Sequence, residues 1–504
     1  MVVPAERQDR TRLDGFELEI FKLVRKNVTS AQWREWLRVP LEHAAADGNE
    51  DLFTRLMDAG ADGSAGWRGC NGRTLLGAAA HGKSKKIAVT LLEAGAQDDL
   101  NVVFGEKRGS ALHVAAARGA GEVSRVLMIA GADPNLRDLQ DSRTPLHVAA
   151  ETGHDGVVGM LLLKGALPDA KTDYDRQTAL HLAARSGHDL CVSELLLAGA
   201  DKDSRNCLRL TPLHLAAQCN RLGALGKLVA AGANLHARDS TDWSPFHFAA
   251  CKGHVDAVRA LLRHGSRVEE SVGFGLTALH NAALLGCGDI IRVLLEAGAN
   301  IEASAFDGDT PLHTAISRTM GSRGTFRALL EGGANVHSRN TNGVTPLHKA
   351  CSESCIVAAE FLLRWGADET LADHNGDTPA DEVGKWEDDP YFEHEDSDNE
   401  EDRLADDLRI RHMLARAPAD RRWRRRGWLV LARRRPAKVQ LATVSGENDD
   451  CRYGSTKIAR SGVDGSGEGG DEAGNPRRVD LQRLVGRVLG LDVEGVFRLV
   501  VGFL

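Results

Sequence analysis

Apolar and polar positions along most of the chain follow a block pattern that returns at nearly constant spacing. In a clear example, Thr144-Pro145 opens a short Ala-rich run that stops near Gly153, and residues 155–163 form a second, Leu-rich run. Thr is suited to a helix N-cap, Pro to the first helical position and Gly to the residue that ends a helix. The pattern therefore predicts two short helices per block, followed by a polar connector suited to a projecting turn or hairpin.

Copies of this block extend from residue 40 to residue 382. With the proline position of Thr-Pro-Leu-His as the mark, they fall at residues 40, 74, 111, 145, 179, 212, 245, 278, 311, 346 and 379. The longest step precedes residue 111, where residues 100–108 form either a contact loop or a tolerated insertion. One block cannot bury its own apolar face, so each should depend on its neighbours, with atypical copies capping the two ends.

A repeat of about 33 residues that carries Thr-Pro-Leu-His-x-Ala resembles the ankyrin repeat. The resemblance implies an all-α fold: an ankyrin-repeat α-solenoid of stacked helix-turn-helix units with projecting β-hairpin or turn connectors. Thin first helices beside bulky second helices should place the first helices on a concave side. The resemblance also implies that each signature histidine hydrogen-bonds at its own helix start and connector. These histidines are His113, His147, His181, His214, His247, His280, His313 and His348.

The expected organisation has a helical N-terminal cap at residues 1–39, with an independent docking motif as the alternative, and the repeat array at 40–385. Residues 386–438 change abruptly from acidic to basic and are expected to be a disordered linker, as is the stretch 439–478. Residues 479–504 are rich in apolar residues but interrupted by glycines. That composition is typical either of a short partner-docking helix or of an error in the gene model.

The overall composition narrows the functional classes. A formal net charge of -8 and a pI near 6.2 give no overall bias towards nucleic acid. No secretory signal and no run of about 18 uncharged apolar residues is found, so neither secretion nor a membrane span is expected. Nine scattered cysteines fit reduced thiols in an intracellular protein. We expect a monomer that is cytoplasmic, with a nuclear location as the alternative.

Motifs that would indicate catalysis lack the required context. Residues 77–84 match the phosphate-loop pattern G-x-x-x-x-G-K-S, but their alanines align with those of the other first helices, so a helix is predicted there. The histidines recur with the repeat, whereas a catalytic site needs one convergent cluster. The sequence therefore predicts no enzyme, no cofactor, no metal and no small-molecule substrate.

The family resemblance implies that partner proteins are contacted by the connectors and by the residues just before the first-helix glycine. Leu208, Trp243, Phe274 and Phe306 are unusual at connector tips, and adjacent units would align them in an apolar stripe. The alternative is that these side chains fold down between connectors. The full set of candidates is Tyr174, Asp175, Gln177, Arg185, Leu208, Leu210, Trp243, Lys252, Phe274, Leu276, Phe306 and Arg318.

The sequence thus predicts a protein–protein interaction scaffold. The alternative is a substrate-recognition adaptor in ubiquitin ligation or nuclear signalling whose tail recruits effectors. Ser397, in an acidic stretch, is a candidate phosphorylation site. A basic cluster is a candidate nuclear-targeting signal or nucleic-acid patch, with association with the acidic segment as the alternative. The cluster contains Arg421, Arg422, Arg424, Arg425, Arg426, Arg433, Arg434 and Arg435.

Overall fold

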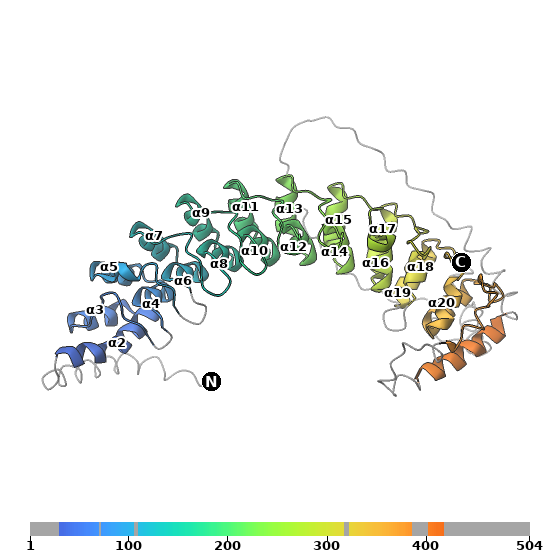
Figure 1. Ribbon diagram of the computed structural model, residues 1–504, viewed down its shortest axis with the longest axis horizontal. Coiled ribbons are helices and arrows are strands. Elements are labelled where there is room, and N and C mark those ends of the chain that lie inside the picture. The colour runs from blue at the N-terminus through green and yellow to red at the C-terminus, as the bar shows by residue number, and fades with distance from the viewer. Residues whose placement is uncertain (1–29, 70–71, 105–108, 317–321, 386–401, 418–504) are drawn as a thin grey trace, which may run out of the picture. The chain divides into compact units, whose positions relative to one another are not determined.

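The computed structural model describes residues 30–69, 72–104, 109–316, 322–385 and 402–417 (Figure 1). The chain divides at Arg411, and the repeat array lies in the unit that precedes this division. The regular secondary structure of the described residues is almost entirely helical, as the repeat pattern predicts. Among them, no helix is both long enough and apolar enough to cross a membrane.

Each repeat contributes a first helix, which begins directly after the Thr or Ser of the signature in every described copy except the first. The first helices are α2 (Ser30–Ala46), α4 (Leu75–Gly82), α6 (Ala111–Arg118), α8 (Pro145–Thr152), α10 (Ala179–Ser186), α12 (Pro212–Gln218), α14 (Pro245–Cys251), α16 (Ala278–Leu284), α18 (Pro311–Thr314) and α20 (Pro346–Ser352). The Thr or Ser before each helix from α4 onward has extended backbone, as an N-cap residue requires. Glycines with positive φ end several of these helices, for example Gly153 at φ 83°.

A second helix follows in each repeat. These helices are α3 (Glu50–Asp58), α5 (Lys85–Glu93), α7 (Gly121–Ile129), α9 (Asp155–Leu163), α11 (Asp189–Leu197), α13 (Leu222–Ala230), α15 (Val255–Arg263), α17 (Gly288–Glu296), α19 (Arg323–Glu331) and α21 (Ile356–Arg364). The connectors contain the short elements η1 (Ala96–Asp99), β1 (Ser271–Val272), η2 (Gly273–Gly275) and β2 (Leu276–Thr277).

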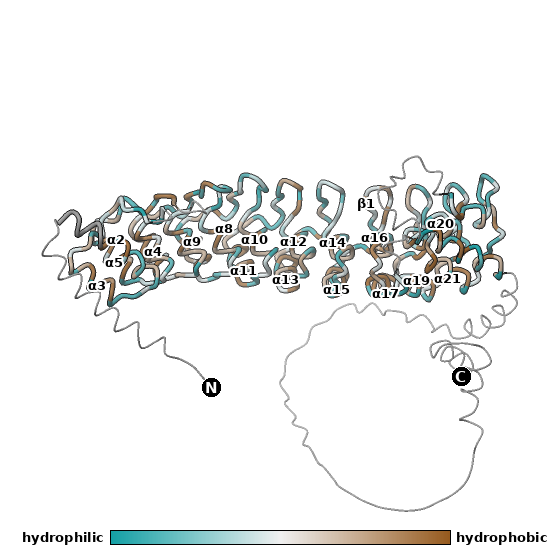
Figure 2. The backbone as a smooth tube through the Cα atoms, turned by 90° about the horizontal axis from the view of Figure 1, so that it is seen from below, coloured by the Kyte–Doolittle hydropathy of each residue, from teal (hydrophilic) through white to brown (hydrophobic). Residues whose placement is uncertain are grey.

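The core lies between neighbouring repeats. First helices pack on first helices and second helices on second helices, so the array has two rows (Figure 1). In α8, Leu146, Ala149 and Ala150 are buried, and in α9 Val158 and Leu161 are buried. Small alanine side chains let adjacent first helices approach closely. Figure 2 shows the connectors, β1 among them, projecting along one edge, with second helices such as α13 and α15 along the opposite edge.

The N-terminal repeats differ from the sequence prediction in two details. Helix α2 runs through Pro40, so one helix spans the expected boundary between cap and array. Helix α4 begins at Leu75 with Thr74 as its N-cap, so the mark of this copy lies at 75 rather than 74. The register error arose because neither residue 74 nor residue 75 is the proline of the signature.

Residues 77–82 of the phosphate-loop pattern are helical, as predicted. Gly77 lies inside α4, and Ser84 caps α5 by accepting a hydrogen bond from the N–H of Ile87. A side chain at Gly77 would collide with the ring of Phe104, which the lengthened connector places over this helix. Gly77 is therefore required for packing. The lengthened connector before residue 111 contributes at least this buried aromatic ring to the core.

Residues 402–417, which the composition assigned to a disordered linker, form a helix. Within the unit that ends at Arg411, Ile410 is buried, and the guanidinium of Arg411 donates a hydrogen bond to the carbonyl oxygen of Val383. This hydrogen bond joins the helix to the residues that end the array.

Candidate partner-binding surface on the connectors

The signature histidine joins each first helix to the following connector. The backbone N–H of Thr144 donates to Nδ1 of His147 at 3.1 Å, and Nε2 of His147 lies 3.1 Å from the carbonyl oxygen of Gln177. Because Nδ1 accepts the backbone hydrogen bond, the ring proton must be on Nε2, which donates to Gln177. The hydroxyl of Thr144, 2.8 Å from Nδ1, donates to the same nitrogen. The histidines are thus structural, as the resemblance implied.

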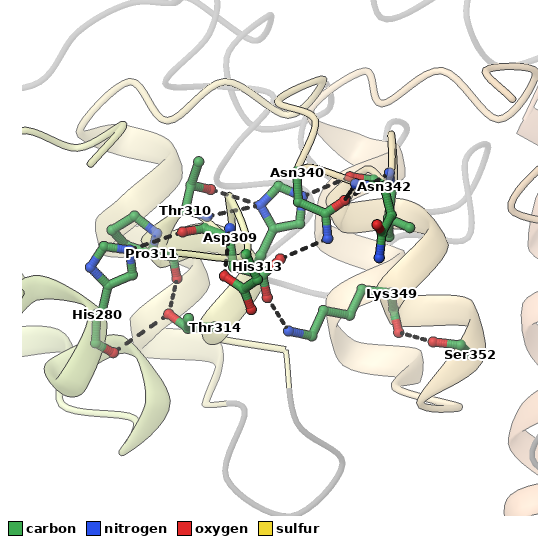
Figure 3. Close-up of polar contacts among 12 residues, drawn as sticks. His280, Asp309, Thr310, Pro311, His313, Thr314, Asn340, Asn342, Lys349 and Ser352 are labelled. Carbon is green, nitrogen blue, oxygen red and sulfur yellow. Dashed lines mark hydrogen bonds and ion pairs between the residues drawn. The ribbon is translucent and has the colours of Figure 1, made fainter. Parts of the chain in front are cut away.

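The same bridge recurs along the array, and Figure 3 shows it for Thr310 and His313. Burial lowers the pKa of His147 to about 4, against a smaller opposing effect of the Gln177 hydrogen bond. Burial likewise lowers the pKa of His181, His214 and His247 to about 4. These rings therefore remain neutral near pH 7, and each fixes the position of the next connector. The carbonyl acceptors in order are Arg143, Gln177, Leu210, Trp243, Glu270, Asp309, Val344 and Asp377.

Backbone hydrogen bonds also join the connector tips to one another. In each bond, an N–H of one connector donates to a carbonyl oxygen of the preceding one. The pairs are Asp173 to Asp141, Cys207 to Asp175, Ser240 to Leu208, Phe306 to Phe274, Thr341 to Asp307 and His374 to Asn342, at 2.9 to 3.1 Å. The connectors that carry Trp243 and Phe274 are joined differently, because Arg238 donates to the carbonyl oxygens of Asp242 and Ser271. The tips form a surface with a fixed spacing.

Two consecutive connectors depart from the polar design of the others. Asn206, Asp239, Asn340 and Asp373 each accept two backbone N–H groups of their own hairpin through Oδ1. The same position is occupied by Val272 in the connector of Phe274 and by Ala305 in the connector of Phe306. Val272 is buried and pairs with Leu276 across the short β1–β2 hairpin. An apolar residue therefore replaces the hydrogen-bonding Asn or Asp in the two connectors whose tips carry phenylalanine.

The two phenylalanines of these connectors frame an open hollow. Both side chains are 79% exposed, and the N–H of Phe306 donates to the carbonyl oxygen of Phe274 at 2.9 Å. Phe274 has φ 64°, a left-handed conformation that a bulky residue rarely adopts. Gly275 has φ 75°, and a Cβ there would come within 2.7 Å of the Phe306 ring. The hollow has a volume of about 330 Å³ and is lined by Phe274, Leu276, Ala305, Phe306 and Asp307.

The other members of the proposed apolar stripe are arranged differently. Leu208 is exposed, but Trp243 is half-buried and packs against Phe248 with ring centroids 5.4 Å apart. The phenylalanines therefore project, whereas the tryptophan folds down onto its own first helix. Of these residues, the structure brings Phe274 and Phe306 together. Sequence reasoning missed Ala305 and Asp307. The presence of Val272 and Ala305, where four other connectors have Asn or Asp, could have indicated from the sequence that these connectors differ.

The remaining candidates occupy varied environments. Tyr174, Asp175 and Lys252 are exposed, Leu276 is half-buried at the hollow, and Leu210 and Gln177 are buried. Arg185 is half-exposed and forms an ion pair with Glu151 of the preceding repeat at 3.2 Å. Arg318 lies outside the described residues, as do Ser397, the arginines between residues 421 and 435, and residues 439–504. The proposed adaptor role of the tail depends on these last segments.

A charged group supports the connector beside the hollow. The buried carboxylate of Asp309 lies 2.5 Å from Nζ of Lys349 and accepts a hydrogen bond from Asn340 at 2.9 Å (Figure 3). Burial alone would raise the pKa of Asp309, but the hydrogen bonds from Lys349 and Asn340 hold it below its usual value. The carbonyl of Asp309 also accepts from His280. Asp307, in contrast, is exposed at the hollow.

One cluster of acidic groups in the described residues has metal-ligand spacing. It contains Asp373, Asp377 and Glu382. The ammonium of Lys385 lies 2.7 Å from carboxylate oxygens of both Asp377 and Glu382, and these hydrogen bonds raise the pKa of Lys385. The lysine supplies the positive charge that these carboxylates require, so the cluster gives no reason to invoke a metal.

The comparisons with known proteins agree with the repeat pattern. The family model described as "Ankyrin repeats (3 copies)" matches residues 41–138, 112–206, 146–239, 213–305 and 302–373. These overlapping matches cover more than half of the chain. No curated protein matches it.

Proposed function

Since the chain belongs to the ankyrin repeat family, whose repeats are generally protein–protein interaction modules, we propose that it is a non-catalytic scaffold that binds a partner protein through its connector tips. The hollow between Phe274 and Phe306 is the anchoring point. The observation that carries this proposal is the combination of two highly exposed aromatic rings with a concave space between them.

The local construction supports a binding role better than a packing role. An aromatic residue in a left-handed conformation is unfavourable by roughly 1–2 kcal/mol, and Phe274 does not recover this by burying its ring. In the next connector, Thr341 occupies the position equivalent to Phe306, and Asn342 occupies the position equivalent to Phe274, so both positions can hold polar residues. Aromatic residues in concave sites are favoured anchors in interfaces.

The chemistry of the hollow favours a particular kind of partner segment. Four of its five lining residues are apolar, which suits an aliphatic or aromatic side chain. The exposed carboxylate of Asp307 lies on its lining, so a Lys or Arg next to that side chain would add a favourable charge contact. We therefore expect the partner to present an apolar residue beside a basic one.

Selection of peptides from a displayed random library, with the full chain as bait, tests this proposal. Enriched peptides should carry an apolar residue flanked by Lys or Arg. Replacing Phe274→Asn and Phe306→Thr should weaken their binding by about 30-fold or more, because interface anchors contribute about 2 kcal/mol or more. The matched control is Tyr174→Ser, which removes an exposed connector aromatic away from the hollow. Peptides that bind the double variant as tightly as the parent would contradict the proposal.

A further inference from the structure

The outward surface of the second helices changes character along the array. In α15 and α17 this surface carries Arg259, Arg263, Arg292 and Glu296. The corresponding last residues of α7, α9 and α11 are Ile129, Leu163 and Leu197, whose side chains are 70%, 89% and 82% exposed. The charged residues that end α15 and α17 show that the solenoid does not require apolar residues at these positions. The exposure of apolar side chains at the ends of three successive second helices therefore indicates a contact surface.

Two more exposed leucines extend this surface towards the other ends of the helices. Leu190 is 64% exposed near the start of α11, and Leu222 is 42% exposed at the start of α13. Leu190 and Leu197 are seven positions apart, so both lie on one face of α11. We call the surface formed by Ile129, Leu163, Leu190, Leu197 and Leu222 the outer apolar face.

Helix α9 combines a projecting residue with a depression on the same face. Gly156, Gly159 and Leu163 are spaced by three and four residues, which places them along one line of the helix surface. A Cβ added at Gly156 would meet open space, and one at Gly159 would approach only the Glu194 carboxylate. The outer apolar face therefore has a shallow region at the start of α9 and projecting leucines at the ends of α9 and α11.

We propose that the outer apolar face binds a second copy of the chain about a two-fold axis that passes between α9 and α11. Such an axis reverses both the helix direction and the order of the repeats. It therefore lays α9 against α11 of the second copy and α7 against α13 of the second copy. Leu197 then meets the region of Gly156 and Gly159, and Leu163 meets Leu190. One surface supplies both the projections and the spaces that receive them, as an isologous interface requires.

The charges at the margin of the face are complementary under the same rotation. Lys164, just after α9, comes opposite Asp189 at the start of α11 of the second copy, whose carboxylate lies beside Gly223 of its own α13. Lys227 in α13 comes opposite Glu122 in α7 of the second copy. Lys164 and Lys227 are exposed, and Glu122 also contacts Lys85 and Arg125 of its own copy at 3.3 Å. Opposite charges at two separate pairs of positions favour this register over others.

The size of the face is sufficient for association. Each helix of nine residues is roughly 13 Å long. Four adjacent helices span roughly 40 Å at interaxial distances near 10 Å. The projected area is then about 500 Å² per copy, or about 1,000 Å² for the pair, which reaches the range of specific interfaces. The connectors lie on the opposite edge from the second helices (Figure 2), so a dimer would leave both connector surfaces accessible.

Sedimentation equilibrium of the full chain between 1 and about 100 µM tests the proposal, a range that covers a weak interface of this size. The expected mass is twice 54.3 kDa at the upper concentrations. Leu163→Arg combined with Leu197→Glu introduces the residue types that α15 and α17 carry at the same position, and should weaken dimerisation at least a hundredfold. Glu296→Arg, on the outward surface of α17, is the matched control and should leave the dimer unchanged. Circular dichroism verifies that each variant is folded.

A charge exchange tests the two-fold register. Lys227→Glu alone and Glu122→Lys alone should each weaken the dimer, and the two changes together should restore it. The proposal would be overturned if the parent chain were monomeric at every concentration, if it assembled beyond a dimer, or if the double exchange did not restore the dimer. It would also be overturned if the parent were monomeric and bound a different protein from a native extract that the Leu163, Leu197 variant did not bind, because the occupant would then be another protein.

Discussion

Acidification is expected to destabilise the array through its buried histidines. His147, His181, His214 and His247 have pKa values lowered to about 4 by burial, while an unfolded histidine has a pKa near 6.5. The unfolded chain therefore binds more protons than the folded chain between these values. Each histidine contributes its full stabilisation above pH 6.5 and loses it as the pH falls towards 4.

The size of the effect follows from the two pKa values. At pH 5 an unfolded histidine is almost entirely protonated, whereas a folded ring with a pKa about one unit lower is still mostly neutral. The difference is on the order of 2 kcal/mol for each of these four histidines. If they act independently, the total is comparable with the whole stability of a typical domain, about 5–15 kcal/mol. A marked loss of structure between pH 6.5 and 4.5 is therefore expected.

Urea unfolding at pH 7, 6 and 5, followed by circular dichroism, measures this dependence. The chain with His181→Gln should be less stable at pH 7, because the bridge between Thr178 and Leu210 is weakened. Between pH 6.5 and 4, the slope of its free energy of unfolding against pH should correspond to nearly one bound proton fewer than the slope of the parent. Equal urea midpoints for the parent at pH 7 and pH 5, or the same pH slope in the variant, would refute the reasoning.

Two other substitutions test the connector region. Lys349→Ala should lower the free energy of unfolding by about 1–3 kcal/mol, because it leaves the buried Asp309 carboxylate with fewer donors. Adding Asp309→Asn should recover part of this loss in urea unfolding, and no recovery would contradict the role of Lys349 as the partner of Asp309. Phe274→Asn should raise stability by roughly 0.5–1 kcal/mol while weakening partner binding, since asparagine tolerates the left-handed conformation; a lower thermal midpoint would show that the exposed ring has a packing role.

Much of the fold could be predicted because the residues that begin and end each helix lie within the repeat itself. Thr144, Pro145 and Gly153 specify where a helix begins and ends, and the recurrence of the pattern implies stacking. The first two copies were harder to place because Thr74 is not followed by proline and Pro40 lies inside a continuous helix. The helix at residues 402–417 was missed because the acidic and basic runs dominate the composition of residues 386–438, although apolar residues such as Ile410 recur within it.

The candidate site could be predicted only in part. The sequence identifies Phe274 and Phe306 as unusual connector residues, but it treats them as equivalent to Trp243. The direction of each side chain depends on local backbone conformation. Phe274 is held outward by a left-handed φ, while Trp243 finds an aromatic neighbour in Phe248. The outer apolar face was not recognised, because the Leu-rich run of a second helix does not by itself show which leucines face neighbouring repeats and which face outward.

The most direct test of the proposed binding function is capture of proteins from a native extract by the full chain, compared with the Phe274→Asn, Phe306→Thr double variant and with Tyr174→Ser. A partner retained by the parent and by Tyr174→Ser but lost by the double variant is the predicted result, and its affinity for the purified chains should differ by about 30-fold. Partners that bind the parent and the double variant equally would contradict the claim that the hollow between Phe274 and Phe306 anchors recognition.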